Sequence, residues 1–306
     1  MSTAAVTACA RPNTNPREIL FQAQRPGDTE DLYLMTFATG VTHRLTHGER
    51  AFANSYAQWS PDGQRIAFIR EFDDHNELFV LDSVSAVARL LPTPGLRSIG
   101  WPDWSPDGTK LLIPAGPDWQ HQKLYVLQMD GTGLQAIPAG SDSYSCASWS
   151  PDGRKVVASQ NDSASSLVVT IEAMTGVREI LASSDTTELG CPDWSPDGKT
   201  VLVTVYHGTS AQREAADRAY ADLALLDVSS RALHALTQGP GVNNHGRWDH
   251  TGQWIVFQCT PNPSAGRDTT ARRRFFTSLE ICAIRPDGTG RRQLTNNDYF
   301  DAHPSW

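Results

Sequence analysis

The chain has 306 residues, of which 39% are hydrophobic and 20% are charged, with 23 Gly and 19 Pro. This composition is typical of a turn-rich globular protein, and the length suffices for one large all-β domain. The formal net charge of −8 argues against unspecific nucleic-acid binding, and no apolar run approaches the ~18 residues that a membrane helix requires. We therefore expect neither a nucleic-acid partner nor an integral membrane segment.

Residues 1–16 form a segment of small and polar residues ahead of the first strand-like run. They lack the basic and apolar regions of a signal peptide, so we expect a disordered tail and, for the sequence as written, a cytoplasmic protein. The tetrapeptide Val6-Thr7-Ala8-Cys9 loosely resembles a bacterial lipoprotein cleavage box, which would work only if translation began further upstream. The compartment stays open between these two interpretations.

A short phrase built on tryptophan recurs through residues 17–306. Four copies read Trp-Ser-Pro-Asp-Gly, a fifth is degenerate, and the chain ends on a sixth tryptophan; these residues are Trp59, Trp104, Trp149, Trp194, Trp248 and Trp306. The first four lie about 45 residues apart and the last two gaps are longer, which indicates one repeated unit with insertions. In each turn Pro presets φ, Asp can bond the backbone that follows, and Gly accepts a positive φ.

Each unit contains strand-length apolar runs separated by turns, such as Ile66-Ala67-Phe68 and Leu78-Phe79-Val80-Leu81. With the strand that leads into each Trp and a last strand such as Gln293-Leu294-Thr295, they make four antiparallel strands per unit. Radial units of ~40–45 residues are propeller blades, so six copies predict an all-β, six-bladed β-propeller. Because the chain ends on the strand of Trp306, we expect this C-terminal strand to complete the N-terminal blade.

The Trp-Ser-Pro-Asp-Gly phrase and its partner ending in Leu-Thr resemble the TolB-like propeller repeat over residues 17–306. The resemblance implies a six-bladed propeller with an envelope or scaffold role, although the repeat builds binding proteins and enzymes alike. TolB adds an α/β domain, and the related peptidases add a hydrolase domain with a Gly-x-Ser-x-Gly elbow. No such elbow occurs in the 306 residues, so we expect a propeller alone.

The strands that lead into the tryptophans are predicted to line the central channel. The third residue before each Trp is Tyr56, Trp101, Cys146, Cys191, His245 or His303, and the fifth is Asn54, Ile99, Tyr144, Leu189, Asn243 or Asp301. One side of the ring is thus aromatic and apolar, and the other is polar. Five of the residues on these strands are predicted to contact a ligand or partner: Tyr56, Trp101, Tyr144, Asn243 and Asn244.

Two histidines and a carboxylate fall in neighbouring blades. His245, His303 and Asp301 are a candidate site for a divalent cation, and His207 is the nearest candidate for a further ligand. In the structural alternative, the histidines bond the backbone between blades and Asp301 organises the entry loop. Beyond this possible cation, no cofactor is expected. Two other carboxylates directly precede a Trp and are predicted to accept hydrogen bonds between blades: Asp103 and Asp193.

Four of the five cysteines fall into two pairs. Cys146 and Cys191 occupy the same position in adjacent blades, where small buried thiols are favoured over a disulfide or a metal site. Cys259 and Cys282 lie on neighbouring strands of one hairpin. A disulfide between them is the alternative to free thiols, and it would require an oxidising compartment.

Two insertions interrupt the period of the repeat. Residues 206–222 contain a run of helix-forming residues and are predicted to include a short helix. Residues 260–278 carry a basic and aromatic patch, Arg272-Arg273-Arg274-Phe275, which is either a solvated loop or an anchor for an acidic partner. Both insertions lie between the second and third strands of a blade, so we expect them to wall one rim of the channel mouth.

These observations favour a monomeric, non-catalytic binding module that docks a protein or peptide on the channel-mouth face. The alternative is enzymatic, because some propellers resembling this one, such as oligogalacturonate lyases, use channel histidines and a divalent metal on acidic sugars. In that interpretation His245, His303 and Asp301 would hold the metal, and the arginine patch would face the carboxylates of the glycan. The absence of a clear general base beside the histidines favours binding.

Overall fold

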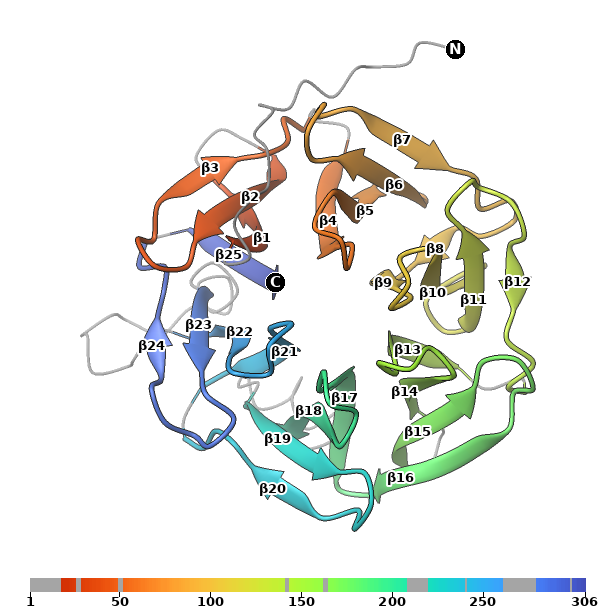
Figure 1. The fold of residues 1–306 in the computed structure, drawn as a ribbon, viewed down its shortest axis with the longest axis vertical. Coiled ribbons are helices and arrows are strands. Elements are labelled where there is room, and N and C mark those ends of the chain that lie inside the picture. The colour runs from red at the N-terminus through yellow and green to blue at the C-terminus, as the bar shows by residue number, and fades with distance from the viewer. Residues whose placement is uncertain are drawn as a thin grey trace.

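The chain forms a ring of six antiparallel β-sheets around a central axis, with the first strand of each sheet nearest the axis (Figure 1). The computed structural model describes residues 18–25, 29–48, 52–140, 143–161, 165–207, 220–239, 241–260, 279–297 and 299–306. The predicted tail, residues 1–16, lies outside this part. Across the described residues, no helix has the length and apolar character needed to cross a membrane. The prediction of an all-β, six-bladed propeller is confirmed.

The first three blades take the following strands. Blade 1 contains β25 (Phe300–Ser305), β1 (Glu18–Gln24), β2 (Glu30–Thr36) and β3 (Thr42–Arg44). Blade 2 contains β4 (Ala53–Trp59), β5 (Arg65–Glu71), β6 (Asn76–Asp82) and β7 (Ala88–Leu91). Blade 3 contains β8 (Ser98–Ile99), β9 (Asp103–Trp104), β10 (Lys110–Gly116), β11 (Lys123–Gln128) and β12 (Gln135–Ala136). Both β8 and β9 pair with β10, so they are two pieces of one inner strand.

The other three blades follow the same order from the axis outward. Blade 4 contains β13 (Tyr144–Trp149), β14 (Lys155–Asn161), β15 (Ser166–Glu172) and β16 (Arg178–Ser184). Blade 5 contains β17 (Thr187–Trp194), β18 (Thr200–His207), β19 (Ala221–Asp227) and β20 (Leu233–Ala235). Blade 6 contains β21 (Asn243–Trp248), β22 (Ile255–Cys259), β23 (Glu280–Ile284) and β24 (Arg292–Gln293).

The C-terminal strand closes the ring. Strand β25 pairs with β1, with Ala302 opposite Gln22, and thereby becomes the inner strand of the N-terminal blade. The hydroxyl of Ser305 donates to the carbonyl of Ala57 in blade 2 at 2.9 Å. The predicted closure is therefore confirmed, and the last strand also joins its blade to the next one.

The core lies between neighbouring blades, because each sheet is buried on both faces by the sheets beside it. Trp59, which is 7% exposed, packs in one apolar cluster with Leu20 and Leu32 of blade 1 and with Phe68 of its own blade. Burial of such surface stabilises the fold by about 25 cal/mol per Å² of apolar area. The repeated tryptophan is thus a contact between blades.

The Ser-Pro-Asp-Gly turn follows the chemistry expected of its residues. In the first copy the Ser60 hydroxyl accepts a hydrogen bond from the N–H of Arg65 at 2.9 Å, and Asp62 accepts from the N–H of Gln64 at 3.0 Å. Gly63 has a φ of 66° and donates its N–H to the carbonyl of Ser60 at 2.8 Å. A side chain at this φ would be strained, which explains why the glycine persists even in the degenerate fifth copy.

The Leu-Thr pair that ends a unit ties its outer strand to a buried carboxylate. The hydroxyl of Thr46 accepts from the N–H of Leu32 at 3.0 Å and donates to Asp31 at 2.7 Å. Thr237 makes the same pair of bonds with Leu223 and Asp222 in blade 5, at 2.9 and 2.8 Å. The same arrangement therefore recurs in blades 1 and 5.

Candidate functional site

The inner strands depart from regular β structure at the third residue before the Trp. A register shift interrupts the β4–β5 pairing between Ser55 and Gln58, and another interrupts the β21–β22 pairing between Asn244 and Arg247. In four blades the residue at this point has a left-handed φ: Tyr56 (49°), Cys191 (44°), His245 (50°) and His303 (49°). Such a bulge changes the direction in which a side chain points. A left-handed φ at a residue other than glycine costs of order 1–3 kcal/mol of stability.

The bulges bring side chains from different blades together at the axis. The ring of Trp101 in blade 3 lies 5.7 Å from Tyr56 in blade 2, 5.2 Å from His303 in blade 1 and 5.7 Å from His245 in blade 6. The two histidine rings lie 5.0 Å apart, and His303 lies 4.8 Å from Tyr56. Together with Cys146 and Cys191, these four residues form what we call the axial layer. Because Trp101 touches residues of the opposite blade, this layer spans the channel.

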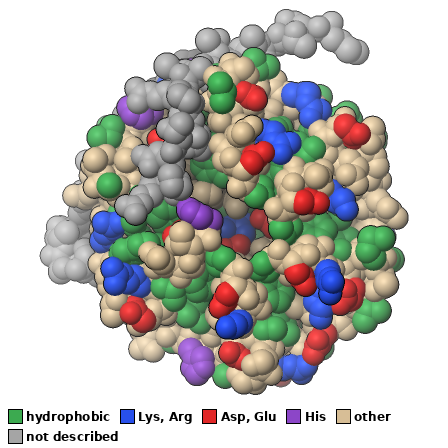
Figure 2. Space-filling view, in the orientation of Figure 1, with side chains coloured by type: hydrophobic (Ala, Val, Ile, Leu, Met, Phe, Trp, Pro, Cys, Tyr) green, Lys and Arg blue, Asp and Glu red, His purple; other side chains and the backbone are tan. Residues whose placement is uncertain are grey.

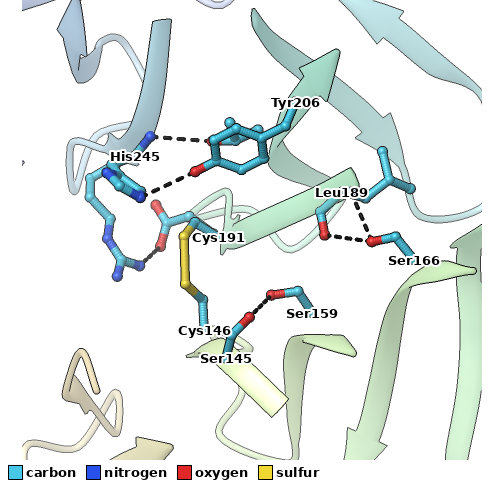
Figure 3. Close-up of a disulfide and its surroundings, with 11 residues drawn as sticks. Ser145, Cys146, Ser159, Ser166, Leu189, Cys191, Tyr206 and His245 are labelled. Carbon is cyan, nitrogen blue, oxygen red and sulfur yellow. Dashed lines mark hydrogen bonds and ion pairs between the residues drawn. A yellow bond between two sulfur atoms is a disulfide. The ribbon is translucent and has the colours of Figure 1, made fainter. Parts of the chain in front are cut away.

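The remaining members of the layer, Cys146 and Cys191, are joined by a disulfide between blades 4 and 5 (Figure 3). The expectation of two separate buried thiols is therefore wrong, because the equivalent positions lie close enough across the blade interface to bond, with a Cα–Cα distance of 4.9 Å. A second disulfide joins Cys259 and Cys282, the alternative left open above. Cys282 lies opposite Phe257, so this bond runs diagonally between β22 and β23.

Each histidine of the layer is held by the blade before it. The backbone N–H of His245 donates to the Thr204 hydroxyl at 3.2 Å, and its ring Nε2 lies 3.3 Å from the Tyr206 hydroxyl (Figure 3). The N–H of His303 donates to the Gln258 amide oxygen at 3.1 Å, and its Nδ1 lies 2.8 Å from the Gln22 amide oxygen. Both rings are therefore fixed in orientation.

The electrostatic surroundings keep both imidazoles neutral. Burial lowers the pKa of His245 to about 4, an effect that the nearby Arg247 charge adds to and that a bond with Gln258 partly offsets. Burial, followed by the His245 and Arg247 charges, lowers the pKa of His303 well below its usual value. Neutral imidazole is the form that binds metals and accepts hydrogen bonds.

The predicted cation ligands do not all meet. The carboxylate of Asp301 is fully buried, with Arg25 donating to one oxygen at 2.6 Å and Asn297 donating to the other at 2.7 Å. His207 pairs with Asp222 at 3.0 Å instead of approaching the histidines of the layer. In the part of the chain that the structure describes, no three His, Cys, Asp or Glu side chains form a group that could hold a metal ion.

The residues five positions before the Trp lie between blades and not in the axial layer. Asn243 donates to Asp222 at 3.2 Å and accepts from Arg291 at 2.8 Å, while Tyr144, 1% exposed, donates to the carbonyl of Ala139 at 3.1 Å. Asn244 is 7% exposed, and its amide oxygen has no hydrogen-bond partner among the described residues. Trp101, another predicted contact residue, likewise has a buried indole N–H without a partner among the described residues.

On one side of the axial layer lies a buried charged cluster. Arg247 stacks on Trp101, 4.4 Å from the ring centroid, and donates to Asp193 at 2.9 Å. Asp193 also accepts from the N–H of Trp248 at 2.8 Å, and Asp103 accepts from the N–H of Trp149 at 2.7 Å. The predicted role of both aspartates as acceptors between blades is confirmed. Figure 2 shows blue and red side chains at the floor of the central hollow on this face.

The charged cluster shifts the pKa of Asp103. Burial raises the pKa of Asp103 to about 7; the Arg247 charge opposes this rise and the Asp193 charge adds to it. One positive charge thus compensates two carboxylates that are close together. The arrangement favours a proton on Asp103 below neutral pH.

On the other side of the layer, where the inner strands begin, two half-buried carboxylates face the channel mouth beside Tyr56. Glu30 begins β2 and accepts a hydrogen bond from the Gln22 amide, and Glu71 ends β5 and accepts from the Ser55 hydroxyl at 2.7 Å. Burial raises the pKa of both carboxyls, and the Glu30 charge contributes further to the rise at Glu71. Burial, then Glu71 and Glu30, raise the pKa of Tyr56 as well.

Sequence reasoning missed Glu30, Glu71, Gln22 and Tyr206, because none of them occupies the repeat position from which the channel residues were counted. The predicted patch at Arg272, Arg273, Arg274 and Phe275 and the predicted helix within 206–222 lie outside the described residues. Their strands can still be followed: β18 and β22 both end, and β19 and β23 both begin, on the channel-mouth side.

Solved structures with the same architecture come from several proteins. TolB from Acinetobacter baumannii superposes with a TM-score of 0.71 at 17% identity, over 95% of this chain and 66% of that chain. A putative TolB from Agrobacterium tumefaciens has a TM-score of 0.66 at 16% identity, over 93% and 89% of the two chains. An oligogalacturonate lyase from Vibrio parahaemolyticus has a TM-score of 0.59 at 13% identity, over 96% and 79%. At these identities the likeness concerns the fold.

The sequence comparisons point to one family. No curated protein matches the sequence. Residues 14–218 match the profile of the TolB beta-propeller domain. This match covers more than half of the chain and includes all four complete Trp-Ser-Pro-Asp-Gly copies. The chain therefore belongs to the TolB beta-propeller domain family.

Proposed function

We propose that this protein is a non-catalytic binding module that docks a protein or peptide at the channel mouth. The observation that carries the proposal is the axial layer, which spans the channel beneath a mouth lined by Tyr56, Glu30 and Glu71. A segment entering there meets a floor of aromatic and imidazole rings rather than an open pore. Aromatic side chains in a recessed, largely desolvated position are typical anchors of protein interfaces.

The strain at the mouth supports a binding role. Four residues of the layer hold a left-handed φ that side chains rarely adopt, and two of them are half-buried histidines whose surroundings favour the neutral form. A ring that only needed to close could fill these positions with small apolar residues at lower cost. Strained backbone and desolvated polar side chains are concentrated at sites where proteins bind ligands.

A second candidate is a metal-dependent lyase or hydrolase acting on an acidic glycan in the channel. The neutral rings of His245 and His303, 5.0 Å apart, favour it, as does the likeness to an oligogalacturonate lyase. Against it, the Asp301 carboxylate is engaged by Arg25, and the carboxylates at the mouth would repel an acidic sugar. Metal content of the purified protein, compared with that of His245→Gln, tests this candidate: stoichiometric metal that the variant loses would favour the enzyme.

Site-directed photocrosslinking in the native host tests the binding proposal. A photoreactive residue replaces exposed Asp73, in the turn after β5 on the mouth side, and a matched one replaces exposed Val84, in the turn after β6 on the opposite side. We expect position 73 to capture one defined protein that position 84 does not capture, and Trp101→Ala to reduce the capture. Equal capture from both positions, or capture from position 84 alone, would contradict docking at the mouth.

A further inference from the structure

Among the described residues, two carboxylates at the channel mouth lack a cationic partner. Within the described ranges, Glu30 accepts from the Gln22 amide and Glu71 from the Ser55 hydroxyl, and these bonds leave lone pairs on each carboxylate. Over the described ranges, neither carboxylate forms an ion pair with a Lys, Arg or His. The other acidic groups on this side differ, because Asp31 pairs with Arg44 at 2.6 Å and Asp301 pairs with Arg25.

A separate observation points to a missing donor at the same place. The amide oxygen of Asn244 is buried and lacks a partner among the described residues, and Asn244 lies opposite Gln258 in the β21–β22 pair. Gln258 accepts from the N–H of His303, whose ring contacts Gln22, the partner of Glu30. Asn244 therefore lies beside Gln258, which contacts His303 and through it the partner of Glu30, while Glu71 is held separately by Ser55. A buried acceptor left without a donor costs about 1–3 kcal/mol, so a ligand that supplies one is favoured.

The remaining surroundings suit an alkyl ammonium group. Tyr56 presents a ring beside both carboxylates, and the rings of His303 and Trp101 lie 4.8 and 5.7 Å from it. Aromatic faces attract cations and also cover the methylene stem of a lysine. The raised pKa values of Glu30 and Glu71 reflect burial and, at Glu71, also the Glu30 charge; a bound cation would offset both effects.

We infer that the channel mouth receives a lysine side chain of the docked partner, whose ammonium group lies between Glu30 and Glu71 and whose stem packs on Tyr56. This inference rests on the proposed function, because it names the chemistry of the partner at that site. Lysine fits better than arginine, since three donors on a compact group match separate acceptors converging from different blades. A free amino terminus carries the same charge on a shorter stem, which reaches less far past the ring of Tyr56.

Three small peptides serve as probes in isothermal titration calorimetry. The first is acetyl-Gly-Gly-Lys-Gly-Gly-amide, the second is the same peptide with an acetylated lysine side chain, and the third is Gly-Gly-Gly-Gly-Gly-amide with a free amino terminus. We expect the first to bind and the other two to bind about tenfold more weakly or not at all. Because the probe changes and the protein does not, this comparison is independent of any folding defect.

Charge-neutral variants then locate the site. Glu30→Gln and Glu71→Gln should each weaken binding of the lysine peptide about fivefold or more, and the double variant should abolish it. Glu172→Gln is the matched control, because Glu172 is half-exposed on blade 4 and pairs with Lys155 at 3.5 Å, so its loss should leave binding unchanged. Thermal unfolding of each variant checks that the propeller is intact.

The outcomes separate this inference from the proposed function. Binding of the lysine peptide that requires both carboxylates supports the inference. Equal binding of the acetylated peptide, binding of the free amino terminus alone, or no binding by any probe overturns it. In each of these cases capture by crosslinking at position 73 would still support docking at the mouth, whereas loss of that capture would remove the proposed function itself.

Discussion

Acidification should destabilise the propeller through His245, and the structure sets the size of the effect. Burial lowers the pKa of His245 from 6.5 to about 4, so between these values the unfolded chain binds a proton that the folded chain does not bind. A depressed pKa on a base means that stability rises with pH through this window and is lost as pH falls. From about pH 7.5 to about pH 5, linkage gives a loss of about 2 kcal/mol from this group alone.

The test compares wild type with His245→Gln, because glutamine stays neutral and can still bond the Tyr206 hydroxyl. The two proteins are unfolded in urea at about pH 7.5 and about pH 5, with tryptophan fluorescence as the readout. The wild type should lose about 2 kcal/mol more than the variant on acidification. His250→Gln, at an exposed turn position, should behave like wild type. If wild type and His245→Gln lose the same stability, then His245 is not held neutral by burial and the reasoning fails.

Three further predictions concern the same ring. A raised carboxyl pKa at Asp103 stabilises the wild-type fold at low pH, and this contribution is lost as pH rises through about 7. As pH rises from about 5 to about 8, the unfolding free energy of Asp103→Asn should therefore increase relative to that of wild type by on the order of 2 kcal/mol. A difference in urea unfolding that stays constant with pH would contradict this. Removing the first disulfide as Cys146→Ala/Cys191→Ala should cost about 4 kcal/mol of stability, and removing the second as Cys259→Ala/Cys282→Ala about 3 kcal/mol, from loop closure over sequence separations of 45 and 23. Unfolded, unreduced protein should show a single reactive thiol. Three reactive thiols would disprove one bond, and five would disprove both. Deleting 297–306 removes β25, so cooperative thermal unfolding should be lost; a truncated chain that melts at the parent temperature would refute the role of this strand in closure.

The fold was predictable from sequence because each repeat contains the residues that form the turn and the residue that packs between blades. The Trp fills the interface with the preceding blade, and the Pro-Asp-Gly that follows can form only a tight turn. Ring closure was predictable as well, since the chain ends on a Trp strand and begins without one. In these respects each local choice agrees with the global architecture.

The site was less predictable because the inner strands are not regular. Counting back three residues from the Trp finds Tyr56, Trp101 and the two histidines, which meet at the axis. Counting back five finds Asn243 and other side chains that face the preceding blade, since the bulge reverses the alternation between the two positions. A bulge is hard to predict from sequence when the residue that forms it is not a glycine.

The disulfide between Cys146 and Cys191 and the carboxylates at the mouth were beyond sequence reasoning for a further reason. Each depends on the distance between neighbouring blades near the axis, which no property of a single repeat sets. Glu30 and Glu71 occupy different strand ends in different blades, yet both influence Tyr56. Their proximity is a property of the ring.

The axial layer connects the stability of the ring to its proposed role. Trp101 of blade 3 contacts His245 of blade 6 across the axis, and the disulfide joins the neighbouring blades 4 and 5, so the layer braces opposite blades as well as adjacent ones. Bracing alone does not require buried imidazoles, a left-handed Tyr56 beside two carboxylates, or an unsatisfied Asn244 oxygen. Each of these features lowers the stability of the fold, and a donor-rich cation that binds at the mouth would offset several of them at once. A ligand that binds there should therefore raise the unfolding temperature of the whole propeller, because the layer it contacts is shared by all six blades.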